Sequence, residues 1–152
     1  MRIHLVAVGR LKKSPYQEMI DEYSKRLTWP LTLSEVEARH QQNAAQKQQQ
    51  EMELIEKQIP DQSYRILLDE RGKLFSSHDF AQKIEHLMIQ GQSSCCFMIG
   101  GSDGFTDGFR AKADFVLSLG KMVWPHKLAR VMLLEQIYRA QQIIAGHPYH
   151  RD

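Results

Sequence analysis

The chain alternates short apolar runs with longer amphipathic segments, and this alternation restricts its fold more than any other feature of the sequence. Apolar runs predict strands at 3–8, 31–36, 64–68, 95–99 and 115–119. Apolar residues spaced three and four apart predict helices at 15–27, 42–59, 77–89, 107–112 and 126–145. Because strands and helices alternate regularly, we expect an α/β fold, with a mainly parallel sheet and helices on both of its faces.

Local signals predict where several of these elements begin and end. Ser14 and Pro15 are typical of a helix N-cap and first turn, and Ser77 is a candidate N-cap for the helix that follows it. The polar segment 69–73 contains Gly72 and predicts a turn after the third strand. Gly146 and Pro148 predict the end of the last helix.

The size and net charge of the chain limit the number of domains and the kinds of binding segment it can contain. Its 152 residues predict a single domain over 1–152, and its net charge of +2 excludes a strongly basic arm or an acidic tail. A local basic patch for nucleic acid stays compatible with that charge.

Cys95 and Cys96 are adjacent and would point to opposite faces of a strand, so we expect two reduced thiols and no metal site. With no signal peptide and no long apolar run, we expect a cytoplasmic protein without a membrane span.

Three of the predicted strands end in unusual segments. These are 67–72, the glycine-rich 100–104, and 117–126, where apolar residues continue into a loop. Ligands of open α/β sheets bind at the carboxyl ends of strands, and glycines allow a close approach of the backbone. The spacing matches neither the dinucleotide-binding nor the P-loop pattern. The glycines therefore indicate either a ligand site or simple turns, and the apolar loop either binds a flat group or packs into the core.

The last predicted helix and the tail carry the remaining candidates. The consecutive apolar residues 131–134 cover every side of a helix, which places it in the core or at a subunit interface. Glu135 and Arg139 are four apart and can pair along the helix. The tail 147–152 is rich in aromatic, imidazole and guanidinium groups, which suit RNA, although a disordered end has the same composition.

Taken together and in order, these segments resemble the RlmH family of the SPOUT superfamily, the ribosomal large-subunit pseudouridine methyltransferases. The residues that carry the resemblance span the whole chain: Leu5-Val6-Ala7-Val8-Gly9, Leu68-Asp69 with Gly72-Lys73, Ile99-Gly100-Gly101 with Gly104-Phe105, Trp124-Pro125-His126 with Leu128 and Arg130-Val131, Glu135-Gln136-Ile137-Tyr138-Arg139-Ala140, and Pro148-Tyr149-His150-Arg151. Each motif alone is weak, and their joint occurrence is specific.

The resemblance implies a fold, an assembly and a reaction. The fold would be a SPOUT fold whose C-terminal part forms a trefoil knot, and the assembly a homodimer. The reaction would transfer a methyl group from S-adenosylmethionine to N3 of a pseudouridine in helix 69 of 23S rRNA on the assembled ribosome. The alternatives are a SPOUT methyltransferase acting on another RNA such as tRNA, a non-catalytic RNA-binding dimer, and an unrelated α/β protein that binds a small molecule.

The resemblance also implies site residues, which carry over by position. The cofactor pocket would consist of Leu68, Gly100, Leu119, Gly120, Lys121, Met122, Val123 and Trp124. The catalytic candidates are His126 and His150 as general base, Arg139 and Arg151 as electrostatic groups, and Tyr149 as a group that stacks on or orients the target base. The sequence departs from the commoner family pattern at Ser102-Asp103 and at Gly120, which leaves the side-chain roles there open.

Overall fold

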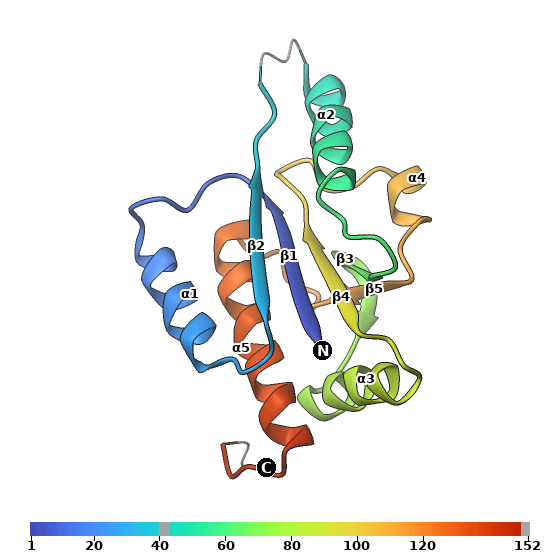
Figure 1. Cartoon of the computed structure of the whole chain (residues 1–152). Coiled ribbons are helices and arrows are strands. Elements are labelled where there is room, and N and C mark those ends of the chain that lie inside the picture. The colour runs from blue at the N-terminus through green and yellow to red at the C-terminus, as the bar shows by residue number, and fades with distance from the viewer. Residues whose placement is uncertain (40–42, 150–152) are drawn as a thin grey trace.

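The computed structural model describes residues 1–39 and 43–149, and its elements follow the predicted alternation of strands and helices. The elements are β1 (Arg2–Val8), α1 (Pro15–Arg26), β2 (Leu31–Val36), α2 (Ala44–Glu56), β3 (Tyr64–Leu74), α3 (Ser77–Ile89), β4 (Ser94–Ile99), α4 (Asp107–Arg110), β5 (Phe115–Ser118) and α5 (His126–Ile144). The strands form one 5-stranded sheet in the order β2-β1-β4-β3-β5 (Figure 1). Every neighbouring pair of strands is parallel, which confirms the predicted sheet.

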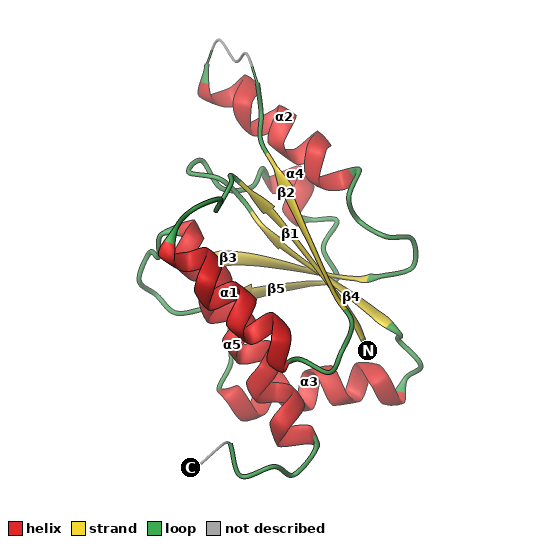
Figure 2. Ribbon diagram, turned by 60° about the vertical axis from the view of Figure 1, so that its left-hand side comes forward, coloured by secondary structure: helices red, strands yellow, loops and turns green. Residues whose placement is uncertain are grey.

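Helices cover both faces of the sheet, as predicted. Three helices, α1, α3 and α5, pack on the face to which Ile3, Leu5 and Ala7 of β1 point. The helices α2 and α4 lie on the opposite face, which receives Val6 and Val8 of the same strand (Figure 2). Neighbouring residues of a strand therefore contribute their side chains to two separate cores, as the two-residue period of a strand requires.

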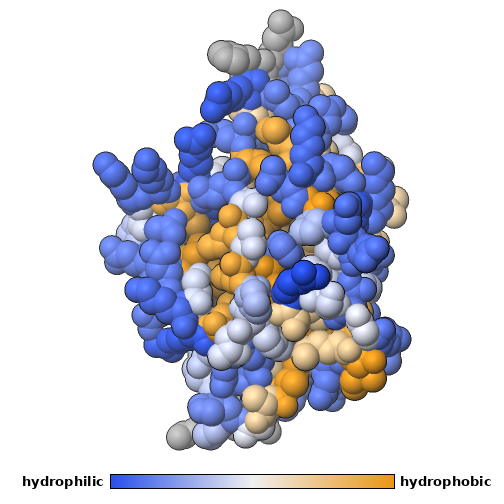
Figure 3. All heavy atoms as spheres, viewed as in Figure 1, coloured by the Kyte–Doolittle hydropathy of each residue, from blue (hydrophilic) through white to orange (hydrophobic). Residues whose placement is uncertain are grey.

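The second face is covered mainly at the carboxyl ends of the strands. There α2 contributes the buried Met52 and Ile55, and α4 contributes Phe109. Below α2, apolar side chains show over the middle of this face, framed by polar ones (Figure 3). The two cysteines are divided between the cores, Cys95 on one face and Cys96 on the other, and both are free thiols. Burial raises the pKa of each thiol to about 12, so both behave as apolar groups.

The turn predicted at 69–73 is wrong, because β3 continues through that segment to Leu74. The strand pairs with β5 up to Leu68, is irregular, and pairs with it again at Lys73 and Leu74. Gly72 lies so close to β5 that a Cβ there would stand 2.6 Å from the carbonyl carbon of Leu117. Gly72 thus permits the close approach of two backbones within the sheet. Glycine is used for such contacts as well as for turns, which is why the segment resembled a turn.

The N-cap of α3 and several helix ends also differ from the predictions, most of all those of α2. Ser76, not Ser77, is the N-cap of α3 and forms a capping box with Asp79. The Ser77 hydroxyl instead donates to Gln136 Oε1 at 2.8 Å. Helix α2 is shorter than the predicted 42–59: it starts after Asn43, whose side chain accepts from the amide of Gln46, and it ends at Glu56. Residue 42 lies outside the described residues.

The apolar run in α5 is mostly satisfied within the chain. Val131, Leu133 and Leu134 are buried against the sheet and its neighbours, whereas Met132 is half-buried. The run therefore places most of this part of α5 in the core of the chain, and the subunit interface, the alternative that its pattern allows, stays a prediction. The knot predicted for the C-terminal part stays a prediction, with which this sheet order is consistent. In the described residues no helix is long and apolar enough to span a bilayer.

A buried arginine ties α5 to the carboxyl ends of β1 and β2. The Arg130 side chain is 2% exposed, and its Nη2 donates to the carbonyls of Val8 and Gly9. Its Nη1 lies 2.9 Å from Oε1 of Glu35 on β2. A guanidinium is suited to this place because it offers five donors in a fixed plane. These bonds fix the first turns of α5 beside the strand ends.

We predict that Arg130→Leu destabilises the protein by about 3 kcal/mol, because the carbonyls of Val8 and Gly9 lose a buried donor and Glu35 loses its ion-pair partner. Urea denaturation followed by circular dichroism measures the change. The matched control is Arg10→Leu, since Arg10 pairs with Glu37 at 3.3 Å but is 59% exposed. That control should change stability by no more than about 0.5 kcal/mol. Equal effects of the two substitutions would contradict the assigned role of Arg130.

Candidate functional site

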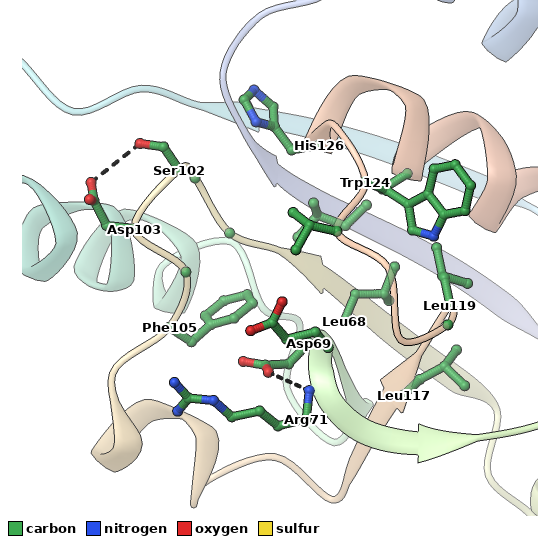
Figure 4. Close-up of a pocket in the computed structure, with 18 of the residues that line it drawn as sticks. Leu68, Asp69, Arg71, Ser102, Asp103, Phe105, Leu117, Leu119, Trp124 and His126 are labelled. Carbon is green, nitrogen blue, oxygen red and sulfur yellow. Dashed lines mark hydrogen bonds between the residues drawn. The ribbon is translucent and has the colours of Figure 1, made fainter.

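A cavity of about 300 Å³ opens at the carboxyl ends of β4 and β5 and beside the part of β3 where its pairing with β5 is irregular (Figure 4). Three segments form most of its wall: the middle of β3, the loop after β4 and the loop after β5. The lining residues are Leu68 to Arg71, Ile99 to Phe105, Arg110, Leu117, Leu119, Gly120, Met122 to Trp124, His126 and Ala129. These are the three strand ends that the sequence singles out, and the parallel sheet brings them to one edge.

The cavity brings most of the predicted cofactor residues together. Its lining includes Leu68, Gly100, Leu119, Gly120, Met122, Val123 and Trp124, but not Lys121. Leu68, Leu117, Leu119 and Trp124 form a largely apolar region at one side of the cavity (Figure 4). Met122 and Val123 are 66% and 79% exposed. Their exposure shows that this apolar loop is not folded into the core of the chain. The interpretation that the loop packs into the core is therefore wrong.

Glycines shape two of the three walls. Gly120 has φ +133°, a backbone conformation that favours glycine, and the Ser118 hydroxyl accepts from its amide at 3.2 Å. Gly104 also has a positive φ, +64°. A Cβ on Gly100 would stand 3.2 Å from the ring of Phe105, so the wall is closely packed there. The glycines therefore do more than terminate strands: they bring backbone atoms to the cavity surface.

An ion pair that the sequence analysis missed fixes the floor of the cavity. Arg110 of α4 donates from Nη2 to Oδ2 of Asp69 at 2.7 Å, and both side chains are mostly buried. The same guanidinium donates to the carbonyl of Phe105 at 3.0 Å. It thus connects the end of the glycine loop to β3. The only signal in the sequence was Asp69 directly after a buried strand, since Arg110 lies 41 residues away.

His126 begins α5 at the edge of the cavity. Its pKa is held below the usual histidine value, first by partial burial and then by the positive charges of Arg130, Lys127 and Lys47. The imidazole is therefore neutral at pH 7, with one ring nitrogen free to accept a proton. The structure places this candidate base beside the predicted cofactor residues.

The other described catalytic candidates lie elsewhere. Arg139 is 13 residues beyond His126 on α5, a rise of about 20 Å along the helix axis. Its Nε donates to Glu135 Oε1 at 2.9 Å, which confirms the predicted pair, and its guanidinium lies 5.0 Å from the Tyr149 ring centroid. The Tyr149 hydroxyl donates to Glu135 Oε1 at 3.3 Å. His150 and Arg151 lie outside the described residues.

The cluster of Glu135, Arg139 and Tyr149 borders a second hollow. This hollow has a volume of about 550 Å³ and shares the lining residues Leu117, Leu119 and Gly120 with the first cavity. Its lining is mainly apolar: Met19, Tyr23, Leu74, Phe75, Phe80, Leu117, Leu119, Leu128, Val131 and Met132, together with the polar Ser76, Ser77, Ser118, Gly120, Glu135 and Gln136. Met19 and Leu74 are 46% and 49% exposed. One loop thus separates a polar-rimmed cavity from an apolar surface.

The residues present fit a flat, positively charged ligand better than a metal ion. Among the described residues no group of three or more His, Cys, Asp and Glu side chains could hold a metal. The cavity instead combines apolar walls with charged side chains. Asp69 and Arg110 of the lining pair with each other, which leaves the carboxylates of Glu70 and Asp103 against the guanidinium of Arg71, an excess of acids. The indole N–H of Trp124 is buried and has no hydrogen-bond partner in the part of the chain that the structure describes, so it is a donor left for a ligand to satisfy.

Comparison with known proteins gives a consistent result along the whole chain. A family model described as "Predicted SPOUT methyltransferase" matches residues 1–150. A protein of Rhodospirillum centenum called ribosomal RNA large subunit methyltransferase H is 46% identical over 151 residues, covering 99% of each chain. A protein of the same name from Roseobacter denitrificans is 46% identical over 160 residues, covering 100% of each.

A solved structure shares the fold at low sequence identity. It is a probable methylase family protein from Haemophilus influenzae, with a TM-score of 0.54 and 11% identity. The match covers 99% of this chain and 70% of that one. The likeness concerns the arrangement of the sheet and helices alone.

We predict that Gly100→Val lowers the affinity for S-adenosylmethionine, the ligand expected from the family resemblance, on the order of 100-fold. The added side chain has no room beside Phe105 and would displace the wall of the cavity. Isothermal titration calorimetry measures the affinity, and thermal unfolding checks that the variant folds. The control is Gly108→Ala, because a Cβ on Gly108 meets nothing within 4 Å. Unchanged binding by the folded Gly100→Val variant would move the ligand site elsewhere.

Proposed function

The chain belongs to the SPOUT methyltransferase family, among the relatives called ribosomal RNA large subunit methyltransferase H, and we propose that it methylates N3 of a pseudouridine in helix 69 of 23S rRNA on the assembled ribosome. The methyl donor is S-adenosylmethionine. The observation that carries the proposal is the cavity formed by the irregular part of β3 and the ends of β4 and β5, which gathers seven of the eight expected cofactor residues.

The cavity offers each part of such a cofactor a partner of suitable chemistry. Leu68 and Leu119 provide apolar surface for a flat adenine, and Gly100 leaves backbone atoms accessible to its polar edge. The unpaired indole N–H of Trp124 is a further donor. When bound, S-adenosylmethionine supplies a methyl group on a positively charged sulfur. The acidic side chains of Glu70 and Asp103 favour a cation in this cavity.

N3 of pseudouridine is a poor nucleophile until its proton leaves, because two carbonyls withdraw its electrons. His126 is the candidate base among the described residues, since it lines the cavity and its lowered pKa keeps it neutral at pH 7. His150 stays the alternative base. Arg139 stays charged, because its bond to Glu135 raises its pKa, so it can stabilise the negative charge that develops on the uracil ring.

The working unit in this proposal is a homodimer with shared active sites. In one chain the cavity and the cluster of Arg139 and Tyr149 lie toward opposite ends of α5, about 20 Å apart along its axis. The apolar hollow lies between them, with Met19 and Leu74 exposed. Association of two copies through this surface would bury it and bring the tail of one copy to the cavity of the other. An enzyme of assembled ribosomes would act in the cytoplasm.

We predict that the protein methylates intact ribosomes at least about tenfold faster than free 23S rRNA, and leaves tRNA unmodified. The physical reason is that a chain of this size presents little RNA-binding surface, so the ribosome must supply docking contacts. Ribosomes from cells lacking the modification are incubated with labelled S-adenosylmethionine, and the modified nucleotide is mapped by mass spectrometry of RNA fragments. Preferential labelling of tRNA would support the alternative RNA substrate. Cofactor binding without transfer to any RNA would support a non-catalytic role.

The shared active site makes a separate prediction for mixed dimers. A Gly100→Val chain and a chain lacking 149–152 should each be inactive alone. In their heterodimer one intact cavity meets one intact tail, so an equal mixture should regain about a quarter of the normal activity. The control mixes two differently tagged Gly100→Val chains and should stay inactive. No recovery, with heterodimers verified by native mass spectrometry, would contradict the sharing of sites between subunits.

A further inference from the structure

Helix α2 buries a carboxyl group that neither the fold nor the proposed reaction explains. The Glu51 side chain is 1% exposed, and within residues 1–39 and 43–149 neither of its carboxylate oxygens has a hydrogen-bond partner. Lys47, one turn earlier on α2, holds its Nζ 3.8 Å from Oε1, beyond hydrogen-bond distance. An ionised carboxylate in this position lacks both water and direct donors, which is costly unless something compensates its charge.

Glu51 faces the back of the cofactor cavity. A Cβ on Gly101 would stand 2.7 Å and 3.0 Å from the two carboxylate oxygens, so the carboxyl group packs directly on that glycine. Gly101 is also one of the residues that line the cavity. The carboxyl group therefore packs against a residue of the cavity wall that has no side chain of its own to shield a ligand from the charge.

A second contact fixes α2 to the same loop. Gln48, three residues before Glu51 and on the same side of the helix, donates from Nε2 to the carbonyl of Asp103 at 2.8 Å. Figure 4 shows α2 beside the loop that carries Ser102 and Asp103. Glu51 and the glycine wall thus form one packed unit, and the carboxyl group cannot leave the cavity wall without moving α2.

The charged groups around Glu51 do not neutralise it. Burial raises its pKa, and the negative charge of Asp103 on the loop acts in the same direction. Lys47 on α2 is the opposing charge, and its weaker effect lowers the pKa. His126 on α5 also senses Lys47 and becomes cationic as the pH falls. A positive ligand in the cavity would be a further stabilising charge for the ionised carboxylate.

We propose that Glu51 makes the cavity selective for charge, favouring the cationic S-adenosylmethionine over the neutral sulfur of S-adenosylhomocysteine. This inference rests on the proposed function, because it concerns the donor and product of that reaction. The two ligands differ by one methyl group and one positive charge, so contacts to adenine and ribose cannot distinguish them. A carboxylate behind a glycine wall acts on the charge alone, and it would weaken product binding once the methyl group has left.

The proposal predicts how binding depends on pH. A bound cation stabilises ionised Glu51 and lowers its pKa in the complex relative to the free protein. Between these two pKa values, binding of S-adenosylmethionine releases a proton to the buffer, and its affinity rises with pH. The neutral-sulfur product lacks this coupling. Protonated His126 would repel the cation, so titration of His126 also makes the affinity rise with pH. Only the difference in pH dependence between wild type and a Glu51 variant therefore isolates the contribution of Glu51.

The test compares wild type, Glu51→Gln and the control Glu53→Gln, an exposed acid on the same helix. Titration calorimetry measures the affinities for S-adenosylmethionine and S-adenosylhomocysteine between about pH 5.5 and pH 7.5. Near pH 7.5 the preference for S-adenosylmethionine should fall about tenfold in Glu51→Gln and stay unchanged in Glu53→Gln. The pH dependence of the preference should also be weaker in Glu51→Gln. Titrations in buffers of different ionisation enthalpy should show fewer protons released by this variant.

The outcomes separate this inference from the proposed function. If both ligands bind wild type and the preference is the same in Glu51→Gln, charge selection by Glu51 is wrong while the proposed function stands. If neither ligand binds wild type, both are wrong. Should Glu51→Gln fail to fold, carbon-13 NMR of the glutamate carboxyls in wild type follows the ionisation directly. A Glu51 signal that titrates identically with either ligand would then overturn the inference.

Discussion

The placement of α5 depends on one buried guanidinium. Arg130 satisfies the carbonyls at the end of β1 and pairs with Glu35 on β2, so it holds the start of α5 against the carboxyl edge of the sheet. The loop that precedes α5 forms one wall of the cavity, and His126 lies one helical turn before Arg130. The position of the candidate base and of this wall thus follows from a single set of hydrogen bonds, formed between residues more than 90 positions apart.

Most of the fold could be predicted because its signals are local. The alternation of apolar runs and amphipathic segments predicted the strands and the parallel sheet. The segments that carry Leu68 and Gly100 stood out as strand ends, where ligands of such sheets bind, and their assignment to the cofactor came from the family resemblance. The segment 69–73 was misread because glycine serves both turns and close backbone contacts, and only the neighbour β5 distinguishes them. Glu51 lies four residues before Ile55 and therefore on the buried side of α2. This spacing could have indicated a buried carboxyl group, but the sequence analysis considered only the apolar residues of the helix.

The long-range parts of the site had no local signal. Nothing near Asp69 in the sequence indicates that Arg110 will pair with it, and the link between Glu51 and Gly101 joins two segments 50 residues apart. A knot, which the family resemblance predicts, would lie beyond such reasoning for the same reason, since periodicity does not record how a chain passes through itself. The separation of Arg139 and Tyr149 from the cavity likewise emerged only in three dimensions, and it is what makes a second copy of the chain chemically necessary in our proposal.

The most direct test of this account is a crystal structure of the protein with S-adenosylhomocysteine. The account predicts that the adenine lies between Leu68 and Leu119, that the indole N–H of Trp124 gains a partner, and that Tyr149 of a second copy lies at the same cavity. A ligand bound in the apolar hollow, or a cavity left empty while ligand binds elsewhere, would contradict it.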